Sequence, residues 1–125
     1  MRNDFQTPLD FDDKAVIDNV LIEYHDLHEI SQGGPVVGSL SINKKIIGDH
    51  LFGGPFLIHE KSIYIPAYVK KFMGWGFRLM KIEMSNLDRT FLGDTKNLIF
   101  LNRVESNYLY YFEDVNKITQ GFIEL

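Results

Sequence analysis

Residues 56–65 read FLIHEKSIYI, in which two short apolar runs flank the polar trio Glu60-Lys61-Ser62. Short runs rich in Ile, Tyr and Phe on either side of a few polar residues are typical of two antiparallel strands joined by a turn. Residues 98–112, LIFLNRVESNYLYYF, repeat this arrangement around Glu105-Ser106-Asn107. The sequence therefore predicts two β-hairpins. Their short connections exclude a parallel α/β fold, which needs a longer crossover between strands.

Alternation of apolar and polar residues predicts further strands over residues 36–43 and 77–84. Residues 98–101 are apolar on both faces, as in a central strand, and the polar residues 113–120 have room for one helical turn. We expect a mainly β fold, an antiparallel meander of about eight to ten short strands. The meander forms a barrel or a two-sheet sandwich, with at most one or two short helices.

Residues 15–30 fit two structures. As a helix, the segment aligns its apolar side chains from Val16 to Leu27 in one stripe, with Asp12 or Asp13 as the N-cap. As a strand, it is rich in β-branched and aromatic residues and runs directly into a Gly-Gly-Pro turn. We predict a strand over residues 19–30.

The length of 125 residues predicts a single domain, residues 1–125, whose residues 1–12 form a loosely ordered N-terminal segment. The absence of cysteine excludes thiol catalysis, disulfides and zinc fingers. His25 and His28 lie three residues apart, but a metal site needs a third ligand. No nucleotide-binding loop or hydrolase motif is present. We therefore expect no metal, no cofactor, no catalytic residue and no enzymatic activity.

The first thirteen residues, MRNDFQTPLDFDD, lack the apolar core of a signal peptide. No apolar run approaches the roughly 20 residues that a membrane helix needs. We expect a cytoplasmic protein that has no membrane partner.

Charge is distributed unevenly along the chain. The formal net charge is −4, yet residues 1–30 hold eight acids and two bases, a local net of −6, and the remaining residues carry +2. A localised acidic surface accelerates association with a basic partner. The acidic residues that we predict to bind a partner are Asp10, Asp12, Asp13, Glu23, Asp26 and Glu29.

Trp75, the single tryptophan, stands between Gly74 and Gly76. Because tryptophan is enriched among interface hot spots, we add Trp75 to the predicted partner-binding residues. The alternative is that Trp75 folds back over the sheet as a lid of the core. The basic and aromatic residues 68–77 have the character of a stacking site for single-stranded nucleic acid. The net acidic charge argues against that reading, and we expect no nucleic-acid partner.

The chain resembles the small, acidic, cysteine-free immunity proteins that bacteria make against contact-dependent or polymorphic toxins. The stretches that carry the resemblance are the two Gly-Gly-Pro turns, FGGPFLIHEKSIYIP at residues 52–66, LIFLNRVESNYLYYFED at residues 98–114 and the acidic first quarter. The resemblance implies a cytosolic inhibitor that masks the active site of a cognate toxin, often a basic nuclease. It carries over no catalytic residue.

A competing hypothesis is a β-barrel that binds a small molecule or a sugar. Its interior would be lined by Tyr64, Tyr108 and Tyr110. A ligand that binds the folded state raises its stability, so thermal-shift measurements distinguish the two hypotheses.

Overall fold

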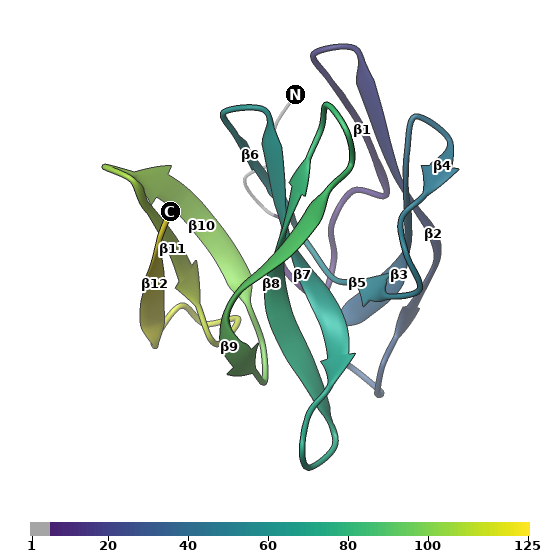
Figure 1. The fold of residues 1–125 in the computed structure, drawn as a ribbon. Helices are drawn as coiled ribbons and strands as arrows, with labels where there is room; N and C mark the ends of the chain where they lie inside the picture. Colours follow the sequence, from purple (N-terminus) through teal and green to yellow (C-terminus); the bar gives the residue numbers. More distant parts are fainter. Residues whose placement is uncertain (1–5) are drawn as a thin grey trace.

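The structure, a computed structural model, describes residues 6–125 and is built of antiparallel β-strands (Figure 1). Within this part the chain forms twelve strands and no helix, and therefore no helix long and apolar enough to cross a membrane. The strands are β1 (Lys14–Ile17), β2 (Val20–Glu29), β3 (Val36–Ile42), β4 (Lys45–Ile46), β5 (Leu51–Phe52), β6 (Leu57–His59), β7 (Ser62–Lys70), β8 (Trp75–Glu83), β9 (Arg89–Lys96), β10 (Phe100–Glu105), β11 (Tyr108–Phe112) and β12 (Gln120–Glu124).

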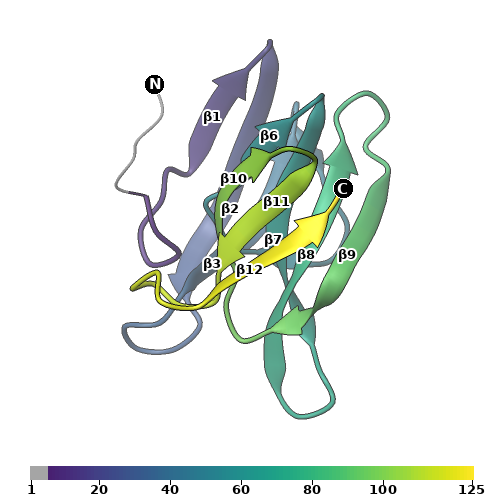
Figure 2. The same cartoon turned by 90° about the vertical axis from the view of Figure 1, so that its left-hand side faces the viewer.

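The strands form two sheets that stack as three layers. The larger sheet has the order β1-β2-β3-β5-β7-β8-β9, with β4 paired to β3 and β6 paired to β7; the smaller has the order β10-β11-β12. The short strand β5 joins β3 to β7 through only three residue pairs, and the large sheet folds over at this point. Figures 1 and 2 show an outer layer of β1–β4, a middle layer of β6–β9 and the three-stranded sheet beyond it.

Two apolar cores lie on opposite sides of the middle layer. In β7, every residue from Ser62 to Ala67 is buried, because successive side chains point alternately into the two cores. The first core, between the outer and middle layers, consists of Phe11, Ile22, Tyr24, Leu40, Ile42, Ile47, Phe52, Ile63, Ile65, Ala67, Met80 and Ile82. The second core, between the middle layer and the three-stranded sheet, consists of Val37, Tyr64, Phe77, Leu79, Ile99, Leu101, Leu109 and Tyr111.

Four hairpins turn through two residues that both have positive φ, as in a type I′ turn. This geometry matches the right-handed twist of the flanking strands. The four pairs are Asp18-Asn19, Asn43-Lys44, Glu60-Lys61 and Ser106-Asn107. The two hairpins predicted around residues 60–62 and 105–107 are thereby confirmed, with turns of two residues.

The structure confirms the mainly β antiparallel fold and the strand predicted over residues 19–30, which is β2. Of the two architectures expected, the sheets form a sandwich and not a closed barrel. Residues 1–5 of the N-terminal segment lie outside the described residues. Within the rest of that segment, Phe11 is buried in the first core, with its ring centroid 4.8 Å from that of Tyr24.

Two local expectations are wrong. Residues 98–101 lead into β10, which is an edge strand of the small sheet and not a central one. Its outward face is covered by the β11–β12 connection, where the Lys117 amine lies 5.5 Å from the centre of the Phe100 ring. That connection holds no helical turn, because the Asp114 carboxylate accepts hydrogen bonds from the backbone N–H groups of Thr119 and Ile118 and shapes the loop. The same bonds hold the pKa of Asp114 below its usual value.

Candidate functional site

The predicted acids all lie in the outer layer or in the segment that leads into it. Residues 6–47 hold seven acids and three bases, a net of −4, because the Asn43-Lys44 turn and β4 bring Lys44 and Lys45 into the same layer. The acidic character of the first quarter is therefore reduced in space but not lost. Five of the six predicted acids are exposed: Asp10, Asp12, Asp13, Asp26 and Glu29.

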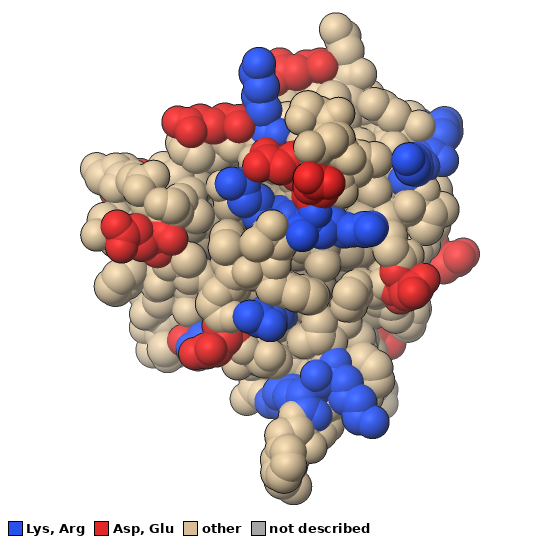
Figure 3. Space-filling view, viewed as in Figure 1, with Lys and Arg blue, Asp and Glu red and all other residues tan. Residues whose placement is uncertain are grey.

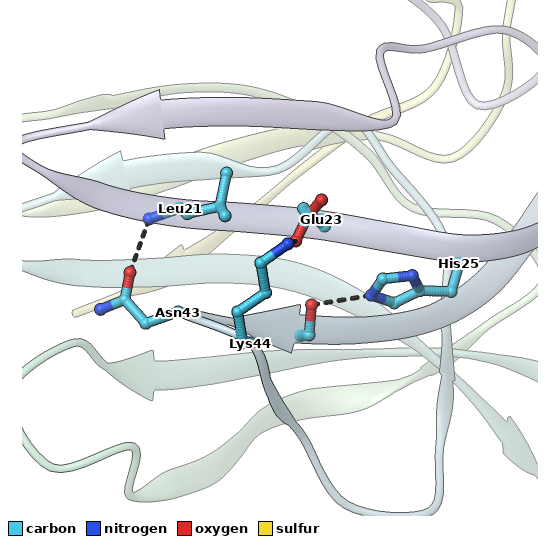
Figure 4. A network of polar contacts seen from close by, with 6 residues as sticks. Leu21, Glu23, His25, Asn43 and Lys44 are labelled. Carbon is cyan, nitrogen blue, oxygen red and sulfur yellow. Dashed lines mark hydrogen bonds and ion pairs between the residues drawn. The ribbon is translucent and has the colours of Figure 1, made fainter.

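Glu23, the sixth acid, already has a cation beside it. Its Oε1 lies 3.2 Å from the Lys44 Nζ, and its side chain is only 14% exposed (Figure 4). The turn that carries Lys44 is fixed by Asn43, whose side-chain oxygen accepts a hydrogen bond of 2.8 Å from the Leu21 N–H. Nearby, His25 Nε2 lies 2.7 Å from the Ser41 hydroxyl. Glu23 thus ties β2 to the β3–β4 turn and offers little free charge to a partner.

Asp26 stands out from its strand because β2 is irregular there. The pairing of β2 with β3 shifts between His25 and His28, and Asp26 has a φ of 56°. A bulge of this kind bends the strand and re-aims the side chains around it. The His28 Nδ1 lies 2.8 Å from the Asp26 backbone carbonyl oxygen, and Asp26 itself is exposed.

The two histidines that looked like metal ligands are thus used in separate local contacts. Among residues 6–125, no three His, Cys, Asp or Glu side chains gather closely enough to hold a metal ion.

Trp75 lies away from the acids, on the hairpin between β7 and β8. The two strands pair as far as Lys70 and Trp75, and the loop beyond them is closed by a hydrogen bond from the Lys71 N–H to the Gly74 carbonyl. In Figure 1 this hairpin projects at the bottom, past the other strands. The Trp75 ring stacks on Tyr68 at 5.2 Å between centroids and remains 55% exposed. Trp75 is therefore not a lid of either core.

A hollow of about 760 Å³ adjoins the base of this hairpin. Arg78 sits within it, held by a 2.8 Å hydrogen bond from its Nε to the Gly93 carbonyl and by the Phe91 ring, 5.0 Å away. His50 approaches Phe91 edge-on at 5.5 Å. The lining residues are Asp49, His50, Leu51, Tyr68, Val69, Lys70, Trp75, Arg78, Phe91 and Thr95.

No feature of the sequence predicts this hollow. Its walls come from β5 and the two residues before it, and from β7, β8 and β9; the spacing of His50, Arg78 and Phe91 along the chain matches no motif. Only pairing of these strands in space brings the three side chains together. Flat aromatic faces beside a fixed guanidinium are suited to a small planar or anionic molecule.

The three tyrosines expected to line a barrel interior do not meet. Tyr64 is buried in the second core. Tyr108 and Tyr110 lie on the three-stranded sheet, where both rings pack against Phe122 at 5.7 and 6.3 Å. The prediction that these tyrosines line a shared ligand cavity is therefore wrong, and so is the closed barrel that this prediction required.

Comparisons of this chain with protein-family models, with curated proteins and with solved structures found no match. The geometry of the two surfaces therefore carries the functional argument: the exposed acids of the outer layer, and the β7–β8 hairpin with the hollow beside it.

Proposed function

We propose that this protein binds a basic protein partner through its outer layer. The observation that carries the proposal is the excess of acids there, seven against three bases over residues 6–47. Five of the predicted acids are exposed. In its specific form the proposal is an immunity protein, which neutralises a cognate bacterial toxin, a basic nuclease, by masking the toxin's active site. Support for that form comes from the resemblance in size, charge and lack of cysteine.

The acids act first by steering. Clustered surface charge of one sign raises association rates with an oppositely charged partner, and the effect weakens as salt screens it over about 8–10 Å. A bound acidic surface also occupies the cationic groups with which a nuclease holds its phosphate substrate. Binding alone then suffices for inhibition, without any catalytic residue in this chain.

Glu23 and Trp75, which the sequence predicts to bind the partner, have lesser roles in the proposed contact. Glu23 is paired with Lys44, and Trp75 stands on a different layer from the acids. We therefore assign the toxin contact to Asp10, Asp12, Asp13, Asp26 and Glu29.

The experiment uses purified candidate toxins of basic charge, and measures the Kd and the residual nuclease activity of each at increasing salt. We expect Asp12→Lys/Asp13→Lys and Asp26→Lys/Glu29→Lys each to weaken binding at least about tenfold at low salt and to flatten its salt dependence. The matched control is Glu60→Lys, which reverses a charge that is 84% exposed on the middle layer. Salt-insensitive binding, or equal losses in the control, would contradict the proposal.

A second candidate function, small-molecule binding, is supported by the hollow beside Trp75. Its volume of about 760 Å³ lies within the range of ligand pockets. A panel of sugars and planar anions tested by thermal shift examines it. A ligand of the hollow raises Tm in the native protein and not in Arg78→Ala, whereas a panel without any shift removes this candidate.

A further inference from the structure

The end of the β7–β8 hairpin exposes three large apolar side chains in close succession. Phe72 is 99% exposed, Met73 78% and Trp75 55%. We propose that this end, called the apex and defined as residues 70–75, docks the protein on an anionic lipid surface. This proposal departs from the expectation, drawn from the sequence, that the protein has no membrane partner. It is independent of the toxin proposal, which concerns the outer layer.

The apex side chains are ordered by depth in a way that fits a bilayer surface. Phe72 and Met73 occupy the loop itself, and Trp75 is the first residue of β8. Lys70 is the last residue of β7, and Lys71 follows it in the loop. Apolar side chains enter the hydrocarbon boundary, tryptophan prefers the interface, and lysines reach the charged headgroups. Figure 3 shows blue lysine and arginine side chains gathered directly behind the tan end at the bottom of the molecule.

The fold places both lysines of the apex beside its apolar side chains. The Lys71 amine donates a 2.6 Å hydrogen bond to the Asn97 side-chain oxygen, and Lys70 pairs across the hairpin with Trp75. Two lysines beside three apolar side chains supply both of the contributions that reversible membrane binding requires. Either contribution alone is too weak.

The charge distribution selects the orientation. An overall charge of −4, with the outer layer at −4 over residues 6–47, is repelled by an anionic surface. The chain can therefore approach such a surface only with the basic apex in front. The uneven charge distribution that favours a basic partner at the outer layer thus also orients the β7–β8 hairpin toward acidic headgroups.

A lipid surface fits the apex better than a protein partner does. The three exposed side chains offer roughly a few hundred Å², whereas a stable protein interface needs about 800 Å² on each partner. Phe72 stands at the end of a convex projection, with only 1% of its surface covered by the described chain. A soft, deformable surface accommodates such a projection without a preformed cleft.

The test uses the intact protein and vesicles of phosphatidylcholine, with and without phosphatidylserine. Trp75 is the only tryptophan, so its emission reports on the apex directly. We expect co-sedimentation and a blue shift with the mixed vesicles and neither with phosphatidylcholine alone. Phe72→Ser/Met73→Ser is expected to lower the bound fraction at least about tenfold, and Lys70→Glu at least about threefold.

Two control variants make the same chemical changes elsewhere. Ile118→Ser removes an apolar side chain that is 78% exposed, and Lys45→Glu reverses a lysine of the outer layer. Both are expected to bind vesicles like the native protein. No binding by the native protein, or equal losses in the controls, overturns the proposal. The proposal is also overturned if the native protein does not bind vesicles and the apex variant loses affinity for the toxin. That result would show that the apex binds a protein and not a lipid surface. Loss of vesicle binding with intact toxin binding separates this inference from the proposed function.

Discussion

The outer layer and the apex of the β7–β8 hairpin are both exposed, but they relate to the cores in opposite ways. Strand β2 presents Glu23 and Asp26 to one side and buries Ile22 and Tyr24 on the other. The apex lies beyond both cores, and Phe72 is 99% exposed. Side chains in the outer layer are thus partly explained by folding. Phe72 and Met73 contribute nothing to folding that the structure shows, so their apolar character points to a role in binding.

The largest expected effect comes from the strand on which both regions depend. Ile65 of β7 is fully buried in the first core, beneath the outer layer. Ile65→Ala is expected to lower the free energy of unfolding by about 2–5 kcal/mol, since it removes buried methylenes and leaves a cavity. Urea denaturation measures this, with Val16→Ala as the control because Val16 is 66% exposed. Equal, small losses in both variants would contradict the three-layer description.

Tyr24→Phe is expected to weaken the attachment of the outer layer specifically. The buried Tyr24 hydroxyl donates a 2.7 Å hydrogen bond to the Gly53 carbonyl, and burial raises the pKa of Tyr24, so the donor stays protonated. The substitution leaves a buried carbonyl without its donor and is expected to cost about 1–3 kcal/mol. Tyr110→Phe is the control, because the Tyr110 hydroxyl makes no hydrogen bond within residues 6–125. A loss no larger than that of the control would show that the bond is unimportant.

The β6–β7 turn lies at the opposite end of β7 from the apex. Substitutions in this turn can raise the stability of the protein without changing a residue of the outer layer or of the apex. Glu60 and Lys61 adopt φ values of 49° and 65°, which are unfavourable for both residue types. Glu60→Asn/Lys61→Gly supplies the pair preferred in type I′ turns and is expected to stabilise the protein by about 1 kcal/mol. Thermal unfolding measures the gain. Asn19→Gly, at a turn that already suits its residues, should gain less, and the reverse ranking would contradict the turn assignment.

The smallest expected effect is at the apex. Phe72→Ser/Met73→Ser is expected to change the free energy of unfolding by less than about 0.5 kcal/mol, because neither side chain packs on the described fold. The measurement is the same urea titration. A loss above about 1 kcal/mol would show that the apex has a structural role and would remove the sharpest contrast between the two regions.

The two Gly-Gly-Pro copies show which structural features can be predicted from the sequence and which cannot. In Gly33-Gly34-Pro35 no residue is buried; a Cβ added at Gly33 would meet nothing, and the nearest neighbours of one added at Gly34 would be atoms of Ser31 in the same turn. Gly53-Gly54-Pro55 is packed tightly, and a Cβ on Gly54 would lie 2.8 Å from the Tyr24 hydroxyl. The sequence predicts a turn at both, because local conformation is encoded locally. Which copy is buried depends on Tyr24 and Phe11, residues distant in the chain.

The same limit applies to the larger features. Runs of β-branched and aromatic residues beside polar or Gly-Gly-Pro turns predicted the hairpins and the strand over residues 19–30. The layer that covers each strand could not be predicted. Residues 98–101 are apolar on both faces, which predicts a central strand, but a loop and not a strand covers Phe100. The acids and Trp75 were visible as residue types, but pairing of Glu23 with Lys44 and the distance of Trp75 from the acids are properties of the folded chain.

The most direct test of the central claim, that the exposed acids of the outer layer carry the contact with a basic partner, is the Kd of the cognate toxin measured against salt. The comparison is between Asp12→Lys/Asp13→Lys and Phe72→Ser/Met73→Ser. We expect the acid variant to bind at least about tenfold more weakly with a flattened salt dependence, and the apex variant to bind like the native protein. Unchanged affinity in the acid variant with loss in the apex variant would contradict the claim.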